Sequence, residues 1–215
     1  MSSFLKRELP HLAILLVMFL LVLYFWNIVP EKSPVHWGID GEPDRYGGRA
    51  EALLVLPLIS AGLYFLLLVI PFLDREKFKE KKGRKIYDQV RFLTLAFLLG
   101  MQIVSLLQIV NPTFSFLDLF IPLLGVFYIF LGLIIKKAPP NSKFINVPFE
   151  INDEESFKKL ISYIGNTIIV IGLSTILSAF LLPLYAFILF MGLNILMVVL
   201  LFVKSFQLSK EEGNL

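Results

Sequence analysis

The stretch that decides the fold is Leu160–Val203, LISYIGNTIIVIGLSTILSAFLLPLYAFILFMGLNILMVVLLFV, which contains no Asp, Glu, Lys or Arg. A helix rises about 1.5 Å per residue, so a run of this length extends roughly 66 Å, twice the ~30 Å hydrocarbon core of a bilayer. The stretch therefore predicts two membrane-spanning helices joined by a tight, uncharged hairpin. Phe92–Ile135 is a run of equal length, interrupted only by Asp118, and predicts a second pair.

Two further apolar stretches precede these pairs, at about residues 10–30 and 52–73. We therefore predict an all-α polytopic membrane protein with six transmembrane helices. The composition agrees, because only 17% of the residues are charged and 57% are hydrophobic, whereas a soluble domain carries about 25% charged residues. The chain has no cysteine, which excludes disulfides, thiol catalysis and cysteine-based metal centres.

The basic residues predict the orientation. Of the 20 Lys and Arg residues, 17 fall in the N-terminal stub, the second and fourth loops and the C-terminal tail. The first loop carries only Lys32, Arg45 and Arg49. An excess of Lys and Arg marks the cytoplasmic face, so we expect a multi-pass protein of the cell membrane with both termini cytoplasmic and residues 31–51 outside. The same bias explains the net charge of +3, so membrane lipid is the expected partner and nucleic acid is not.

The spans and loops divide the chain into six segments. These are an N-terminal two-span domain with its outer loop (1–75), a basic cytoplasmic loop (76–91), the third and fourth spans (92–136), a cytoplasmic loop with a short amphipathic helix (137–165), the fifth and sixth spans (166–204) and a polar tail (205–215). Asn152 and Glu155 resemble a capping box that opens the amphipathic helix. This helix is either interfacial or a cytoplasmic extension of span five.

Polar and small residues within the later spans have two interpretations. They are Gln102, Ser105, Gln108 and Asn111 in span three, Gly125 and Gly132 in span four, and Thr167, Ser174 and Ser178 in span five. They either form close helix–helix contacts or line a polar cavity, as in a small-solute transporter or channel. Packing is the favoured interpretation, because we expect no charge near the centre of a span. We also expect no His/Glu pair or Asp dyad within the spans, and hence no catalytic activity.

The outer loop contains the most specific segment, Pro34–Arg49, PVHWGIDGEPDRYGGR. Its four glycines and two prolines predict a small shaped element rather than a simple connector. Histidine, aromatic, acidic and arginine side chains are concentrated within it. The candidate ligand-binding residues are Pro34, His36, Trp37, Gly41, Pro43, Asp44, Arg45 and Tyr46.

Several chemistries are open to this loop. Asp40, Glu42 and Asp44 alternate like the opening of a calcium loop, but Arg45 occupies the position of the turn glycine. A single histidine, His36, is too few for a tetrahedral zinc site. His36 can instead titrate near neutral pH, or it can hold the turns together with Asp44. We expect no metal and no cofactor.

One set of residues in this region resembles a known family. The set is Pro30, Pro34, His36, Trp37, Gly41, Pro43, Asp44, Tyr46 and Gly47, followed by Leu56 and Pro57. It resembles a bacterial and archaeal membrane domain of unknown function with a P-x-H-aromatic-x(3)-G-x-P-D core, over about residues 10–75. That domain commonly forms the N-terminal part of proteins similar to the sporulation-delaying-protein immunity protein. Later parts of the pattern are represented by Pro140, Asn141, Phe144, Pro148, Phe157, Ile161 and Gly165, while its glycine, arginine and histidine before and within span five are missing.

The resemblance implies an immunity protein that shields the cell from a secreted peptide toxin. It also implies that such a protein senses the toxin and holds a transcriptional repressor at the membrane. The implied partners are thus an extracellular peptide toxin and a cytoplasmic regulator. We therefore predict a sensor or immunity-like protein that recognises an extracellular peptide or envelope component through the outer loop. The small-solute transporter or channel is the alternative.

Overall fold

The computed structural model describes residues 3–74, 78–113, 115–139, 148–149, 151–181 and 183–213. Six of its helices are long and apolar enough to cross a membrane. They are α1 (Ser3–Phe25), α2 (Arg49–Leu73), α3 (Lys81–Val110), α4 (Phe116–Ile135), α5 (Glu154–Ser178) and α6 (Pro183–Glu211). The prediction of an all-α, six-span membrane protein is confirmed.

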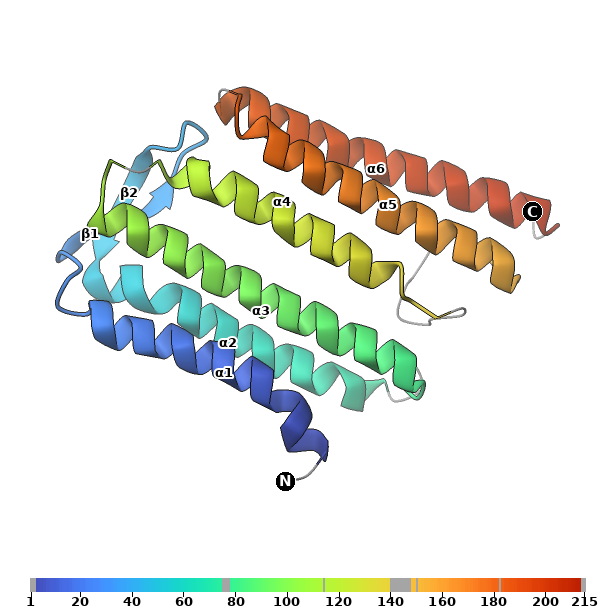
Figure 1. Cartoon of the computed structure of the whole chain (residues 1–215), viewed down its shortest axis with the longest axis horizontal. Coiled ribbons are helices and arrows are strands. Elements are labelled where there is room, and N and C mark those ends of the chain that lie inside the picture. Colours follow the sequence, from blue (N-terminus) through green and yellow to red (C-terminus); the bar gives the residue numbers. More distant parts are fainter. Residues whose placement is uncertain are drawn as a thin grey trace.

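The helices lie side by side as an antiparallel bundle (Figure 1). α1, α2 and α3 pack together, α4 lies between α3 and α5, and α6 packs on α5 (Figure 1). Both chain termini lie at the end of the bundle opposite the two short strands (Figure 1). Large apolar side chains such as Phe187, Ile195 and Val198 are exposed on the outward faces, which lipid would cover.

The contact between α4 and α5 is made by glycines. A Cβ atom on Gly125 would lie 2.6 Å from the carbonyl oxygen of Gly172, and a Cβ on Gly132 would lie 2.6 Å from that of Gly165. Without side chains at these points the two backbones touch, which is how membrane helices gain close van der Waals contact. The packing interpretation of the span-four glycines is therefore confirmed, and their partners on α5 are also glycines.

Two helices begin at positions that differ from the predicted boundaries. α3 begins at Lys81, so most of the predicted loop 76–91 is helix. α5 runs without a break from Glu154, so the predicted amphipathic helix is the extension of span five and not a separate interfacial helix.

The cap of α5 is also displaced from its predicted position. The N-cap is Asp153, whose carboxylate accepts a hydrogen bond from the Ser156 amide at 2.7 Å, so the cap predicted at Asn152 is wrong by one residue. Asp153 lies three residues before Ser156. At this spacing an N-cap side chain accepts a hydrogen bond from a backbone amide that has no partner within the helix. Hydrogen bonding from Ser156 holds the pKa of Asp153 below its ordinary value.

The outer loop folds into a β-hairpin, which the all-α prediction did not include. β1 (Lys32–Trp37) pairs antiparallel with β2 (Pro43–Gly48), and the register shifts between Pro34 and Trp37. Gly41 in the turn has φ +85°, a conformation that only glycine adopts readily. The Asp40 carboxylate accepts a hydrogen bond from the Glu42 amide at 3.1 Å, which closes the turn.

The hairpin is seated on the ends of three helices. Trp37 stacks on Phe116 at the start of α4, with ring centroids 4.3 Å apart and planes inclined by 10°. Arg49, the first residue of α2, donates from Nε to the Val29 carbonyl at 2.8 Å, just beyond α1. Asp118 lies in the first turn of α4, where a carboxylate is favoured beside the positive N-terminus of a helix. The hairpin is thus held in one position above the bundle.

Candidate functional site

A pocket of about 310 Å³ lies between the hairpin and the helices below it. From the hairpin it is lined by Pro34, His36, Trp37 and Arg45, four of the eight predicted binding residues. Ser105 from the predicted intramembrane polar set lies at its base on α3. Four of the predicted residues thus share one cavity, and the sequence gave no sign that α3 closes this cavity from below. We call this cavity the outer pocket.

The polar groups of the outer pocket are arranged in pairs, with one exception. His36 Nδ1 lies 2.6 Å from Asp44 Oδ1, and these side chains are 63% and 50% exposed. Arg45 Nη1 lies 2.6 Å from Glu51 Oε1. The exception is the buried indole nitrogen of Trp37, which has no acceptor among the described residues. Buried donors are normally satisfied, so this unpaired donor is unusual, and it belongs to a residue that lines the pocket.

The other predicted residues of the loop shape the hairpin. Asp44 acts through His36, Gly41 forms the turn and Pro43 is paired with Trp37 across the strands. Tyr46 is 51% exposed, with the Lys32 ammonium 5.6 Å from its ring centroid. These residues do not line the outer pocket, although Asp44 orients a side chain that does.

The predicted polar residues of span three have separate environments. Gln102 is buried and donates from Nε2 to the Met18 carbonyl of α1 at 3.1 Å. Ser105 and Gln108 are buried as well. Asn111 is exposed, lies at the C-terminal cap of α3 and accepts a hydrogen bond from the Thr113 hydroxyl at 2.7 Å. Gln102 thus joins α3 to α1, and the set ends at the hairpin end of the bundle.

The predicted hydroxyls of span five lie on the far side of α4. Ser178 is buried and donates to the Thr175 carbonyl within its own helix at 2.7 Å. Ser174 is half-buried on the same helix. Because α4 lies between α3 and α5 (Figure 1), the structure does not bring the hydroxyls of span five together with the polar groups of span three. The residues proposed for a polar conduit thus form two separate sets.

A buried charged cluster at the other end of the bundle was missed by the sequence analysis. Its members are Glu8 of α1, Tyr64 of α2, and Asp88 and Arg91 of α3. Arg91 Nη2 and Nη1 lie 2.9 Å and 3.3 Å from the two carboxylate oxygens of Glu8. Glu8 and Arg91 are 1% and 2% exposed. The expectation concerned charges near the centre of a span; Glu8 is the sixth residue of α1 and Arg91 the eleventh of α3, so this buried pair was not predicted but lies off centre.

The expectation that no His/Glu pair lies within the spans is wrong. α1 begins before Glu8, so Glu8 and His11 both lie on the membrane-spanning helix, one turn apart. Asp88 and Arg91 repeat this three-residue spacing on α3. The sequence did contain a signal for this cluster. In each helix, two ionisable residues lie three apart at the margin of an apolar run, and oppositely charged groups at this spacing on one helix face stabilise one another.

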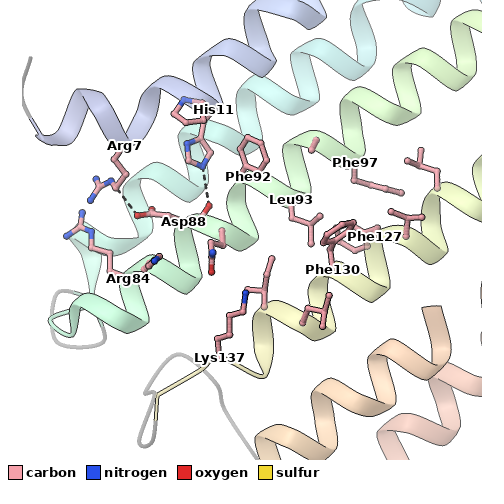
Figure 2. Close-up of a pocket in the computed structure, with 18 of the residues that line it drawn as sticks. Arg7, His11, Arg84, Asp88, Phe92, Leu93, Phe97, Phe127, Phe130 and Lys137 are labelled. Carbon is pink, nitrogen blue, oxygen red and sulfur yellow. Dashed lines mark hydrogen bonds and ion pairs between the residues drawn. The ribbon is translucent and has the colours of Figure 1, made fainter. Parts of the chain in front are cut away.

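The charged cluster joins three helices. Tyr64 donates to Glu8 Oε2 at 3.3 Å, and Arg91 Nη1 also donates to Asp88 Oδ1 at 3.1 Å. His11 Nε2 lies 3.3 Å from the Asp88 carbonyl oxygen, as the dashed line in Figure 2 marks. Both Glu8 oxygens accept hydrogen bonds, so this carboxylate acts as a structural acceptor between α1, α2 and α3.

Comparison with known proteins covers the hairpin and its flanking helices. Residues 13–61 match the domain of unknown function DUF1648. An uncharacterized protein of Archaeoglobus fulgidus is 37% identical over 60 residues, which are 28% of this chain and 32% of the relative. No solved structure matches the chain. The predicted likeness to a membrane domain of unknown function is thus confirmed over most of α1, the hairpin and the first half of α2. The chain as a whole is an integral membrane protein of six apolar helices.

Proposed function

We propose that the protein is a non-catalytic receptor of immunity or sensor type, whose hairpin recognises an extracellular peptide or envelope component. The observation that carries this proposal is a pocket that the hairpin forms with α2, α3 and the start of α4, with Trp37 and Phe116 among its walls. Beside it, the His36–Asp44 pair and Arg45 supply further polar groups that solvent and a ligand reach.

The size of the outer pocket favours a peptide over a compact small molecule. Its volume of about 310 Å³ is at the lower limit of ligand cavities, which hold about 300–1,000 Å³. It therefore accommodates one or two side chains and not an entire drug-sized ligand. The two-stranded sheet leaves each strand with one neighbour among the described residues. An extended peptide adds to such an edge through its backbone and places alternate side chains in a pocket.

The expected orientation and the family resemblance both support this reading. The Lys and Arg distribution favours a cell-membrane protein with cytoplasmic termini and an outer hairpin. The DUF1648 match covers the motif that resembles the sporulation-delaying-protein immunity family, whose ligand is a secreted peptide toxin and whose cytoplasmic partner is a repressor. The transporter alternative is not supported by any arrangement of the polar residues, because α4 separates the two sets.

A protection assay tests the proposal. The protein would be produced in a bacterium sensitive to the sporulation-delaying toxin, and survival measured after toxin addition. We expect survival with the natural chain and loss of protection with His36→Gln/Asp44→Asn. A matched control, Lys32→Gln, removes a hairpin charge that does not line the outer pocket and should leave protection unchanged. Full protection by the correctly folded double variant, or no protection by the natural chain, would overturn the proposal.

A further inference from the structure

A second cavity, of about 930 Å³, lies between α1, α3 and α4 at the end of the bundle opposite the hairpin. We call it the inner groove; Figure 2 shows the side chains that line it. Its walls differ along its length. Toward the middle of the bundle they are apolar and aromatic, and at the end of the bundle they carry five cations: Arg7, Lys81, Arg84, Lys85 and Lys137.

The apolar part of the inner groove follows the facing surfaces of α3 and α4. Phe97 of α3 and Phe127 of α4 close its far end, with ring centroids 4.8 Å apart. Leu93 and Phe130 lie nearer the cations (Figure 2). The distance along α3 from Lys85 to Phe97 is about 18 Å at 1.5 Å per residue. One leaflet of a bilayer is about 15 Å deep, half of the ~30 Å core. The groove therefore runs for about the depth of one leaflet.

The charges at the end of the groove are not balanced. Lys81, Arg84, Lys85 and Lys137 form no ion pair within the part of the chain that the structure describes. The buried Nε of Arg84 has no hydrogen-bond partner there. Asp88 is the acidic residue of the lining, and it already lies 3.1 Å from Arg91 and 3.5 Å from Arg7. An anion is the group that this end of the groove lacks.

We propose that the inner groove binds one anionic phospholipid. Its phosphate lies among Arg84, Lys85 and Lys137, and one acyl chain follows the apolar walls toward Phe97 and Phe127. The separation of the cations from the aromatic end matches the separation of a headgroup from the middle of the bilayer. Lys137 extends from the end of α4 toward α3 (Figure 2), so the headgroup would join the two helices. Basic pockets between spans bind anionic headgroups in this way.

The test compares lipid retention by purified variants in a mild detergent. Native mass spectrometry would count phosphatidylglycerol retained in competition with phosphatidylcholine of the same acyl chains. The test variant is Arg84→Gln/Lys137→Gln. The matched control is Lys82→Gln/Lys210→Gln. It removes two positive charges at the same end of the bundle, from residues that do not line the groove. Thermal unfolding of each variant without added lipid would establish that it is folded.

We expect the natural chain and the control to retain one phosphatidylglycerol with preference over phosphatidylcholine. The test variant should lose that preference by about tenfold or more, because each basic residue near a headgroup contributes on the order of 1 kcal/mol. Equal retention of both lipids by the natural chain would overturn the proposal, as would an unchanged preference in the folded test variant. Stabilisation by free glycerol phosphate equal to that by phosphatidylglycerol would assign the site to a soluble phosphate instead.

A second variant tests the acyl part of the groove separately. Val126 lines the groove and is 41% exposed, so Val126→Trp adds bulk to the space without removing a buried core residue. We expect it to lower retention of phosphatidylglycerol while leaving all cations in place. Retention equal to that of the natural chain would contradict an acyl chain between α3 and α4.

Discussion

Each end of the bundle holds a basic side chain bonded to a carboxylate, but the two pairs lie in opposite environments. At one end Glu8 and Arg91 are 1% and 2% exposed and bonded through both carboxylate oxygens. In the hairpin His36 and Asp44 are 63% and 50% exposed at 2.6 Å. A buried pair cannot lose one partner without leaving an uncompensated charge, whereas an exposed pair exchanges its partner for water. The first pair therefore stabilises the fold, and the second is free to contact a ligand.

The largest expected effect comes from breaking the buried pair. Arg91→Met removes the buried cation that bonds both Glu8 oxygens and leaves only the more exposed Arg7, 3.1 Å from Glu8 Oε1, and we expect a loss of about 3–5 kcal/mol in the free energy of unfolding. Denaturant unfolding in detergent micelles would measure it. The double variant Glu8→Gln/Arg91→Met removes both charges and should recover most of that loss. Arg91→Met of natural stability would contradict the structural role of the pair.

The glycine contact between α4 and α5 adds a third case to the comparison of the two charged sites, because it stabilises the fold without any charge. Gly132→Leu forces side-chain atoms onto the Gly165 backbone, and we expect destabilisation of about 1–3 kcal/mol in the same unfolding assay. Gly192→Ala on α6 is the matched control, because a Cβ there meets nothing within 4 Å. Equal stability of the two variants would show that α4 and α5 are not in close contact.

The stacking of Trp37 on Phe116 connects the hairpin to the bundle. Trp37→Leu removes an aromatic pair that contributes about 0.5–1.5 kcal/mol beyond its buried area. Hydrogen exchange of the hairpin amides should accelerate while exchange within the helices stays unchanged. Trp37→Phe keeps an aromatic ring for the stacking, so it should retain the slow exchange of the hairpin amides. Faster exchange throughout the helices would contradict this local role.

Breaking the exposed pair should change stability least among the charge pairs. His36→Gln/Asp44→Asn is expected to alter the unfolding free energy by less than about 1 kcal/mol, while abolishing toxin protection. The unfolding free energies of this variant and of Arg91→Met together compare the two ends of the bundle directly. A loss of stability in the hairpin variant as large as that of Arg91→Met would remove the distinction between them.

The smallest effect is expected at the exposed cap of α5. Hydrogen bonding from Ser156 lowers the pKa of Asp153, so its stabilising contribution is present above the unfolded-state pKa and is lost as the pH falls through the lowered folded-state value. Asp153→Ala should be slightly less stable than the natural chain at neutral pH. The two proteins should converge in strongly acidic solution, and a difference that grows on acidification would contradict the cap.

The sequence was sufficient for features that depend on composition along the chain. The uncharged run Leu160–Val203 predicted a pair of spans, and Gly125 and Gly132 predicted a close contact. The hairpin was predicted only as a shaped loop, because cross-strand pairing and the stacking of Trp37 on α4 depend on tertiary contacts.

The charged cluster was missed because Glu8 and Arg91 are 83 residues apart. Each lies at the margin of an apolar run, where a charge is normally in solvent. Helix packing brings the two residues together and buries them. A pattern within a single segment of the sequence does not show such a contact. Pro140, Asn141 and Phe144, which represent a later part of the family pattern, lie outside the described residues.

The most direct test of the account is the side of the membrane on which the hairpin lies. The chain has no cysteine, so single cysteines can be introduced at Ile39 in the exposed hairpin turn and at Lys82 on α3, and labelled in intact cells with a membrane-impermeant maleimide. The account predicts that Ile39→Cys is labelled from outside and that Lys82→Cys is labelled only after permeabilisation. Labelling of Lys82→Cys but not of Ile39→Cys in intact cells would contradict an outward-facing receptor.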